Sequence, residues 1–467
     1  MTRFSWLTKT ALPAGAVAVS LAVAGVVSAS GAVADDASPF DVETVASGLD
    51  HPWSVAFLPD GGLLVTELTG QLRVIRDGAV SGPVAGVPEV LFGGQGGLSD
   101  VVLHPDFATN KLVYLTWSAA TDKGNTLFVG RGTFTGDALA GFETIFEADA
   151  HRRTRVHYGA RMAFLPDGTF IVTSGDGFDY RERAQKLDDH FGTTIRLNAD
   201  GSVPADNPFA GDEAALDSIY TYGHRNPQAV VFDPATGVLY SNEHGPQGGD
   251  EINVLEPGAN FGWPLATFGV DYSGAYITPH TDHEGTVQPL HQWTPSIAPS
   301  AMAVYRGDAF ADWNGDLLVT ALAAGNVTEL ADRNLRRVDL EDGAVVADIP
   351  LRVDVPGDAD GTARLRDVRV APDGSIYILT DGEDGAVLRL TPEGGMASIP
   401  AAAQSEEAAE EAAEESAAVP GEGALDDASA TADQIGAGIS GAAEEAAGAV
   451  EEAVEDAAGD ASGTAAE

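Results

Sequence analysis

The sequence contains no cysteine among its 467 residues. This absence excludes disulfide bonds, thiolate metal sites, cysteine nucleophiles, covalent haem attachment and a lipidated cysteine. Basic residues are also scarce, with 25 Lys and Arg against 71 Asp and Glu, which gives a formal net charge of −46. Such a surface repels nucleic acids and anionic lipids, so neither is expected as a partner. The ordinary reason for so much acid is solubility, including adaptation to salt.

Several enzyme motifs are absent as well. No Gly-x-Gly-x-x-Gly follows a predicted strand, and there is no phosphate-binding loop, no His-Glu-x-x-His and no Gly-x-Ser-x-Gly. Nucleotide-binding, zinc-protease and serine-hydrolase functions therefore have no support in the sequence.

The N-terminal segment predicts export. Arg3 and Lys9 precede an apolar run over residues 11–27, and residues 32–34 read Ala-Val-Ala, a small-x-small cleavage site. We therefore expect a signal peptide over residues 1–34, and a secreted, extracellular or periplasmic protein with no stable membrane insertion after cleavage. The alternative is an uncleaved membrane anchor, because the run approaches the length that spans a bilayer.

The C-terminal end differs in composition from the rest of the chain. From about residue 400 it is dominated by Ala, Glu, Asp and Gly and has no Lys, Arg or aromatic residue. Such a segment cannot bury a core. We expect a disordered acidic tail over residues 399–467, which leaves residues 35–398 as the globular domain.

One phrase recurs six times in this domain: apolar residues, a turn of the Pro-Asp-Gly type, and an apolar strand. The copies lie at residues 57–66, 104–117, 164–173, 232–240, 313–320 and 371–380. Pro presets φ for a β-turn and Gly accepts positive φ, while β-branched and aromatic residues favour the strand. Six units of about four strands predict an all-β fold, a six-bladed β-propeller. A pair of β-sandwiches would not repeat one motif six times.

A propeller places its chemistry on loops next to such strands. His157 lies on the loop that leads into the third copy, and Asp176 follows the hairpin of that copy. A hairpin returns its ends to one edge of a sheet, so the two side chains can meet. A carboxylate on one imidazole nitrogen fixes the tautomer and raises the basicity of the other. The pair predicts a general base; the alternative is a structural pair that closes a turn.

Two arginine-containing segments offer binding groups. Arg225 and Asn226 lie on the loop before the fourth copy, where guanidinium and amide groups suit planar carboxylate or carbonyl partners. Arg364 and Arg366 precede the sixth copy on one face of a predicted strand and suit an anionic ligand. The alternatives are a loop-stabilising arginine in the first segment and salt bridges to surface acids in the second.

Residues 243–253 combine acids with glycines and a proline. Gly and Pro expose backbone carbonyls, so a hard cation with oxygen ligands, such as Ca²⁺, fits this segment. The spacing is not that of an EF-hand, and the alternative is an ordinary acid-rich turn.

Together these segments resemble the soluble sugar dehydrogenases that depend on pyrroloquinoline quinone (PQQ), a family that includes soluble glucose dehydrogenase and the aldose sugar dehydrogenases. The resemblance runs from about residue 48 to residue 390. The motifs that carry it occur in order at residues 48–53, 94–98, 157–161, 222–228, 243–253, 260–264, 293–300 and 364–367.

The resemblance implies oxidation of an aldose at C1 to a lactone, with hydride passing to PQQ and electrons to an external acceptor. His157 would be the general base, Asp176 would orient it, and Arg225 would stabilise negative charge on the quinone oxygen. The other implied contacts are these: Gln95, Arg225, Asn226, Arg364 and Arg366 with PQQ; Trp293 with the sugar; the carbonyls of Gly245 and Pro246 with the Ca²⁺ beside PQQ; Glu251 and the backbone of Phe261 with a second, structural Ca²⁺.

The sequence departs from soluble glucose dehydrogenase in two places. Residues 323–325 read Ala-Ala-Gly where that enzyme has a lysine near the cofactor, so PQQ would lose a cationic partner. Loops that form a dimer and a glucose pocket are short, so aldose sugar dehydrogenases are the closer comparison and a monomer or weak dimer is expected. Two other functions stay open: a propeller lactonase, which would need side-chain carboxylates and Asn around its metal, and a non-catalytic extracellular propeller that binds a glycan or protein.

Overall fold

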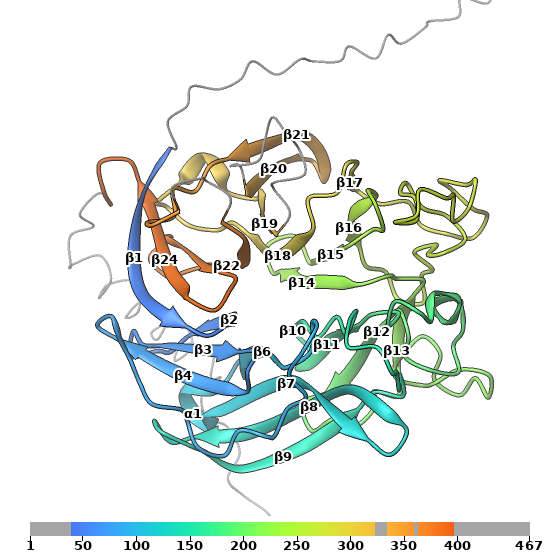
Figure 1. Ribbon diagram of the computed structural model, residues 1–467, viewed down its shortest axis with the longest axis horizontal. Helices are drawn as coiled ribbons and strands as arrows, with labels where there is room; N and C mark the ends of the chain where they lie inside the picture. The colour runs from blue at the N-terminus through green and yellow to red at the C-terminus, as the bar shows by residue number, and fades with distance from the viewer. Residues whose placement is uncertain (1–38, 323–333, 359–362, 397–467) are drawn as a thin grey trace, which may run out of the picture. The chain divides into compact units, whose positions relative to one another are not determined.

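The computed structural model describes residues 39–322, 334–358 and 363–396 (Figure 1). The expected signal peptide, the expected acidic tail and the Ala-Ala-Gly segment at residues 323–325 lie outside these ranges. None of the helices in the described ranges is long and apolar enough to cross a membrane.

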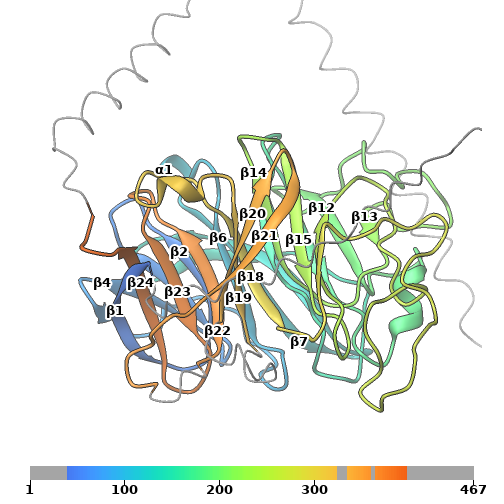
Figure 2. The ribbon, with the colours of Figure 1, turned by 90° about the horizontal axis from the view of Figure 1, so that it is seen from above.

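The described chain forms six four-stranded antiparallel sheets, the blades of a β-propeller, as the sequence predicts (Figures 1 and 2). Blade 1 contains β2 (Pro52–Phe57), β3 (Leu63–Glu67), β4 (Gln71–Arg76) and β5 (Ala79–Val80). Blade 2 contains β6 (Leu98–Leu103), β7 (Leu112–Thr121), β8 (Gly124–Phe134) and β9 (Leu139–Glu147). Blade 3 contains β10 (Met162–Phe164), β11 (Thr169–Ser174), β12 (Thr193–Asn198) and β13 (Ile219–Tyr222).

The second half repeats the arrangement. Blade 4 contains β14 (Pro227–Asp233), β15 (Val238–Glu243), β16 (Asp250–Val254) and β17 (His291–Trp293). Blade 5 contains β18 (Pro299–Val304), β19 (Leu317–Ala321), β20 (Leu335–Glu341) and β21 (Ala344–Leu351). Blade 6 contains β22 (Leu365–Val370), β23 (Ile376–Thr380), β24 (Gly385–Pro392) and β1 (Phe40–Leu49). Short helical turns are α1 (Phe107–Asn110), η1 (Arg181–Gln185) and η2 (Ala311–Trp313).

The recurring turn joins the first and second strands of every blade. In blade 1, Leu58 N donates to Gly62 O at 2.8 Å and Gly61 has φ 83°. In blade 3, Leu165 N donates to Thr169 O at 2.8 Å and Gly168 has φ 80°. Glycine occupies these positions because other residues rarely adopt positive φ. All six hairpins expected from the repeat are therefore confirmed.

The N-terminal strand closes the ring. β1 pairs antiparallel with β24, so that Phe40 lies opposite Pro392 and Leu49 opposite Gly385. Blade 6 therefore takes three strands from the C-terminal end of the domain and its outermost strand from the N-terminal end (Figure 1). Closure leaves no blade without a neighbour on either side.

The core lies between the blades. Buried apolar side chains of the described chain form six clusters, one at each junction of adjacent blades. The first strands of successive blades contact one another around the axis. Each blade buries both faces only by packing against its neighbours, so the core is continuous around the ring.

A buried ionic cluster fills part of the axis. Arg161 Nη1 lies 3.3 Å from Asp100 Oδ1 and 3.1 Å from Asp367 Oδ1, and its guanidinium stacks over Trp53 at 4.1 Å. Arg369 bridges the same two carboxylates at 3.3 and 3.1 Å. This cluster adjoins a cavity at the propeller axis, because Trp53 also lines that cavity.

Candidate active site

The predicted His157–Asp176 pair forms at one mouth of the propeller. His157 lies on the connection between β9 and β10, and Asp176 follows β11 directly. His157 Nδ1 is 2.7 Å from Asp176 Oδ1, and the two residues are 5% and 1% exposed. The other carboxylate oxygen accepts a hydrogen bond from Trp263 Nε1 at 2.8 Å. The pair is thus held by a third residue from the motif at residues 260–264.

The electrostatics keep His157 neutral and Asp176 charged. Burial lowers the pKa of His157 below its ordinary value, and the hydrogen bond and charge of Asp176 oppose this only in part. Burial works against ionisation of Asp176, but the hydrogen bond from His157 and the charge of Arg225 outweigh it, so the pKa of Asp176 is lowered. With Nδ1 donating to Asp176, Nε2 carries the free lone pair. It has no hydrogen-bond partner among the described residues.

The backbone around His157 is fixed from several directions. His157 has a backbone φ of 54°, which residues other than glycine rarely adopt. Its backbone N–H donates to Gln95 Oε1 at 2.7 Å. Its carbonyl accepts from the buried Arg152 guanidinium. These contacts hold the backbone of His157 in a strained conformation, which is typical of functional positions.

Arg225 connects the pair to the segment at residues 243–253. Its carbonyl accepts from Asp176 N at 2.8 Å, and its guanidinium donates to the carbonyls of His244 (3.1 Å) and Gly245. The guanidinium also lies over Trp263, 5.5 Å from the ring centroid. Its neighbour His224 has a supporting role, because Glu243 and Thr221 occupy its two ring nitrogens at 2.8 Å each.

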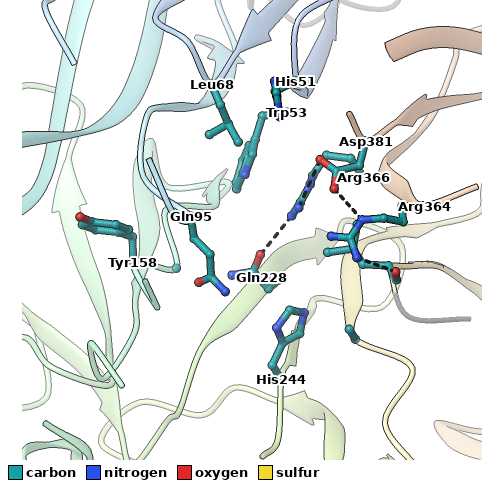
Figure 3. A pocket seen from close by; sticks show the side chains of 14 residues that line it. His51, Trp53, Leu68, Gln95, Tyr158, Gln228, His244, Arg364, Arg366 and Asp381 are labelled. Carbon is teal, nitrogen blue, oxygen red and sulfur yellow. Dashed lines mark hydrogen bonds and ion pairs between the residues drawn. The ribbon is translucent and has the colours of Figure 1, made fainter. Parts of the chain in front are cut away.

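A cavity of about 320 Å³ opens beside this group at the propeller axis (Figure 3). Its lining includes His51, Trp53, Leu68, Gly94, Gln95, Tyr158, Gly159, Gln228, His244, Ala298, Leu322, Arg364, Arg366 and Asp381. Arg364 lies 2.9 Å from Asp381 and Arg366 lies 3.6 Å from it, so two cations share one carboxylate. The cavity therefore carries an excess of positive charge in an acidic protein.

Several polar atoms at or next to this cavity lack partners. Within the described ranges, the buried atoms Arg366 Nε and His244 Nε2 of the cavity lining, and Asn226 Nδ2 behind it, make no hydrogen bond. Asn226 Oδ1, in contrast, accepts from Gly159 N at 3.3 Å and from Gln228 Nε2 at 3.2 Å. Unpaired buried polar groups are costly, so a polar ligand is the expected partner for them.

The acidic segment also forms a small cavity of about 10 Å³, lined by Glu243, Gly245, Glu251 and Phe261 among others. Burial and the nearby charge of Glu243 raise the pKa of Glu251 well above its ordinary value. Asn253 Nδ2 bridges the two carboxylates at 3.1 and 3.2 Å. In the described part of the chain, no group of three or more His, Asp or Glu side chains is suited to a metal ion. A cation here would need backbone carbonyls as ligands.

The structure does not bring Trp293 to these cavities. Trp293 lies on β17, the outermost strand of blade 4, and packs in the core between blades 4 and 5. Its Nε1 donates to Asp348 Oδ2 at 2.8 Å. The aromatic residues that line these cavities are instead Trp53 and Tyr158 at the axial cavity and Phe261 and Trp263 at the small one.

Asp381 lines the axial cavity but was not predicted from the sequence, although the repeat could have indicated it. Asp381 follows the hairpin of the sixth copy, as Asp176 follows that of the third. Both carboxylates therefore emerge at the same mouth, and each holds a side chain that the sequence predicts for the site, His157 in one case and Arg364 in the other. Comparing equivalent positions across the repeat would have found it.

The family model for "Glucose / Sorbosone dehydrogenase" matches residues 49–389. The chain belongs to the glucose/sorbosone dehydrogenase family. It is 40% identical over 360 residues to the aldose sugar dehydrogenase of Escherichia coli K12, covering 75% of this chain and 93% of that protein.

Solved structures agree with this membership of the glucose/sorbosone dehydrogenase family. The apo form of the soluble aldose sugar dehydrogenase from Escherichia coli is 38% identical and superposes with a TM-score of 0.70 over 76% of this chain and 99% of that one. The PQQ-bound aldose sugar dehydrogenase from Streptomyces coelicolor is 27% identical, with a TM-score of 0.59 over 76% and 99%.

Proposed function

We propose that this chain is a PQQ- and Ca²⁺-dependent aldose sugar dehydrogenase that oxidises aldoses at C1 to lactones. The observation that carries the proposal is the His157–Asp176 pair beside a cavity with two arginines and unpaired buried donors. Membership of a sugar dehydrogenase family supports it. The export expected from the N-terminal segment would place the enzyme outside the cytoplasm, where an external acceptor takes the electrons.

The residues at the axial cavity fit PQQ, a flat molecule with three carboxylates and two quinone oxygens. Arg364 and Arg366 would pair with carboxylates, and the free Nε of Arg366 would gain an acceptor. Asn226 Nδ2 is likewise free to donate to an oxygen of the cofactor. Gln95 presents its amide from the loop before β6 (Figure 3). Bound PQQ would supply the acceptor for the hydride that leaves C1.

His157 is suited to remove the proton of the C1 hydroxyl. Its Nε2 is the free nitrogen, and the lowered pKa keeps it unprotonated near neutral pH. Asp176 stabilises the imidazolium that forms and prevents the ring from rotating. Arg225 keeps a positive charge next to the pair and would stabilise negative charge that develops on the acceptor oxygen.

Calcium would occupy the segment at residues 243–253. Gly245 and Pro246 offer carbonyls beside the axial cavity, and Glu251 with the Phe261 carbonyl offers a second, structural site. The raised pKa of Glu251 supports this, because a cation there would relieve the repulsion between Glu251 and Glu243. The guanidinium of Arg225 now donates to the Gly245 carbonyl, so a cation at that oxygen would require Arg225 to turn away.

The test is reconstitution of the purified protein with PQQ and Ca²⁺, with aldose-dependent reduction of a dye as the readout. Activity should require both additions and should be lost in His157→Ala. The Trp293→Phe variant serves as the control, because the Trp293 side chain packs in the core between blades 4 and 5 and lines neither the axial cavity nor the small one. Absence of PQQ binding and of turnover with every aldose tested would overturn the proposal in favour of a lactonase or a binding propeller.

A further inference from the structure

A second cavity, of about 250 Å³, is lined in part by Arg225 and contains an aromatic surface. Phe178, Trp263 and Tyr272 are among its lining residues. Phe178 packs edge-on against the His157 ring, with centroids 5.3 Å apart and an interplanar angle of 78°. The cavity is therefore adjacent to the group that would take the proton from the sugar.

Phe178 is held in place at a conformational cost. Its φ is 68°, a region that bulky residues rarely occupy, and the residue is 45% exposed. Its N–H donates to Asp176 Oδ1 at 2.7 Å, and this carboxylate also binds His157 and Trp263. One carboxylate thus sets the position of the base and of two aromatic walls. A strained backbone that holds a large apolar ring towards solvent is not explained by packing of the core.

Tyr272 extends the aromatic surface outwards. Its ring stacks on Phe178 with centroids 6.2 Å apart and an interplanar angle of 24°, and the residue is 62% exposed. Its hydroxyl accepts from Arg225 Nη2 at 3.4 Å. We call Phe178 and Tyr272 the aromatic platform. The rim beside it is polar, with Arg181 3.6 Å from Asp271.

We propose that the aromatic platform stacks on the apolar C–H face of a pyranose ring and holds the sugar beside His157. A pyranose with equatorial hydroxyls is apolar on its faces and polar at its edge, which matches an aromatic surface with a charged rim. The inference rests on the proposed function for its substrate, an aldose. It assigns sugar recognition to Phe178 and Tyr272 rather than to Trp293.

The first test compares Tyr272→Ala with Tyr272→Phe in the reconstituted enzyme. Loss of the ring should raise KM for glucose by about fivefold to tenfold, with kcat changed by less than about twofold, because stacking binds ground state and transition state alike. Tyr272→Phe keeps the ring and should stay close to the parent KM. The control is Tyr276→Ala, since Tyr276 is 82% exposed and is not a lining residue of this cavity.

The second test measures sugar binding without turnover. Saturation-transfer NMR of the protein with glucose should show magnetisation transfer from the protein to the C–H protons of the sugar ring. Tyr272→Ala should reduce this transfer, and Tyr276→Ala should not. An active dehydrogenase whose KM and saturation transfer are unchanged in Tyr272→Ala would overturn the platform and leave the proposed function intact. Transfer that depends on Tyr272 in a protein with no PQQ-dependent activity would support the platform and overturn the dehydrogenase.

Discussion

Among single residues, Asp176 makes the contacts that fix the geometry of the candidate site. It accepts hydrogen bonds from the His157 ring, the Trp263 ring and the Phe178 backbone. Removing its charge would let the imidazole adopt the other tautomer, with the proton on the nitrogen that should act as base.

We expect Asp176→Asn to lower kcat by roughly 100-fold or more, since general-base catalysis contributes about 10² to 10⁴. The measurement is steady-state dye reduction with saturating PQQ and Ca²⁺. Asp106→Asn is the matched control, because that carboxylate is 80% exposed in a turn of blade 2. Equal activity of Asp176→Asn and the parent would show that the pair is structural.

The pH dependence of the reaction should follow His157. Burial lowers the pKa of His157 below its ordinary value, and the neutral imidazole is the active form. The value of kcat/KM should therefore fall as the pH drops through the lowered pKa, and it should already be on its plateau at pH 7. The pH profile of the reconstituted enzyme checks this. An acid limb centred above the ordinary histidine value would contradict the assignment.

At the scale of elements, β1 locks the ring by pairing with β24. Leu49, at the end of β1, is fully buried in the cluster between blades 6 and 1. Leu49→Ala should lower the free energy of unfolding by about 3 kcal/mol, through lost burial and the cavity left behind. Thr44→Ala, on the exposed side of the same strand, should change it by less than about 0.5 kcal/mol. Urea denaturation followed by fluorescence compares the two.

The elements also explain what the sequence could and could not predict. The six hairpins were predictable because a Pro-Asp-Gly turn acts locally, and they placed His157 and Asp176 at one edge. The position of Trp293 was not predictable, because it depends on β17 being the outermost strand of blade 4, and no local sequence pattern encodes that. Trp263 and Tyr272 reach the site from a long connection between β16 and β17, whose path is set by tertiary contacts.

At the scale of the whole molecule, Arg161 at the start of blade 3 connects all six blades. It pairs with Asp100 and Asp367, stacks on Trp53, and donates to the carbonyls of Gln228 (3.1 Å) and Ser300 (3.3 Å). Those five residues belong to blades 2, 6, 1, 4 and 5. The axial cluster is therefore a common support for the floor of the cavity.

Arg161→Met should lower the free energy of unfolding by about 3 to 5 kcal/mol, because it leaves buried carboxylates without their full complement of positive charge. It should also weaken PQQ binding, since Trp53 and Gln228 line the cavity. Thermal unfolding and a PQQ titration measure the two effects. Arg389→Met is the control, because its partner Asp373 is 42% exposed. A variant as stable as the parent would mean that the cluster does not brace the blades.

The pairing of β1 with β24 constrains the order in which this chain can finish folding. During synthesis β1 emerges among the first described residues, yet its partner strand ends only at Pro392. Until then β1 has an unpaired edge and blade 1 lacks one neighbour, so ring closure is the last step available to the nascent polypeptide. A chain that must cross a membrane before folding would benefit from this delay. Cutting the backbone at one of the Pro-Asp-Gly turns and joining β1 to β24 would remove the delay while keeping every blade.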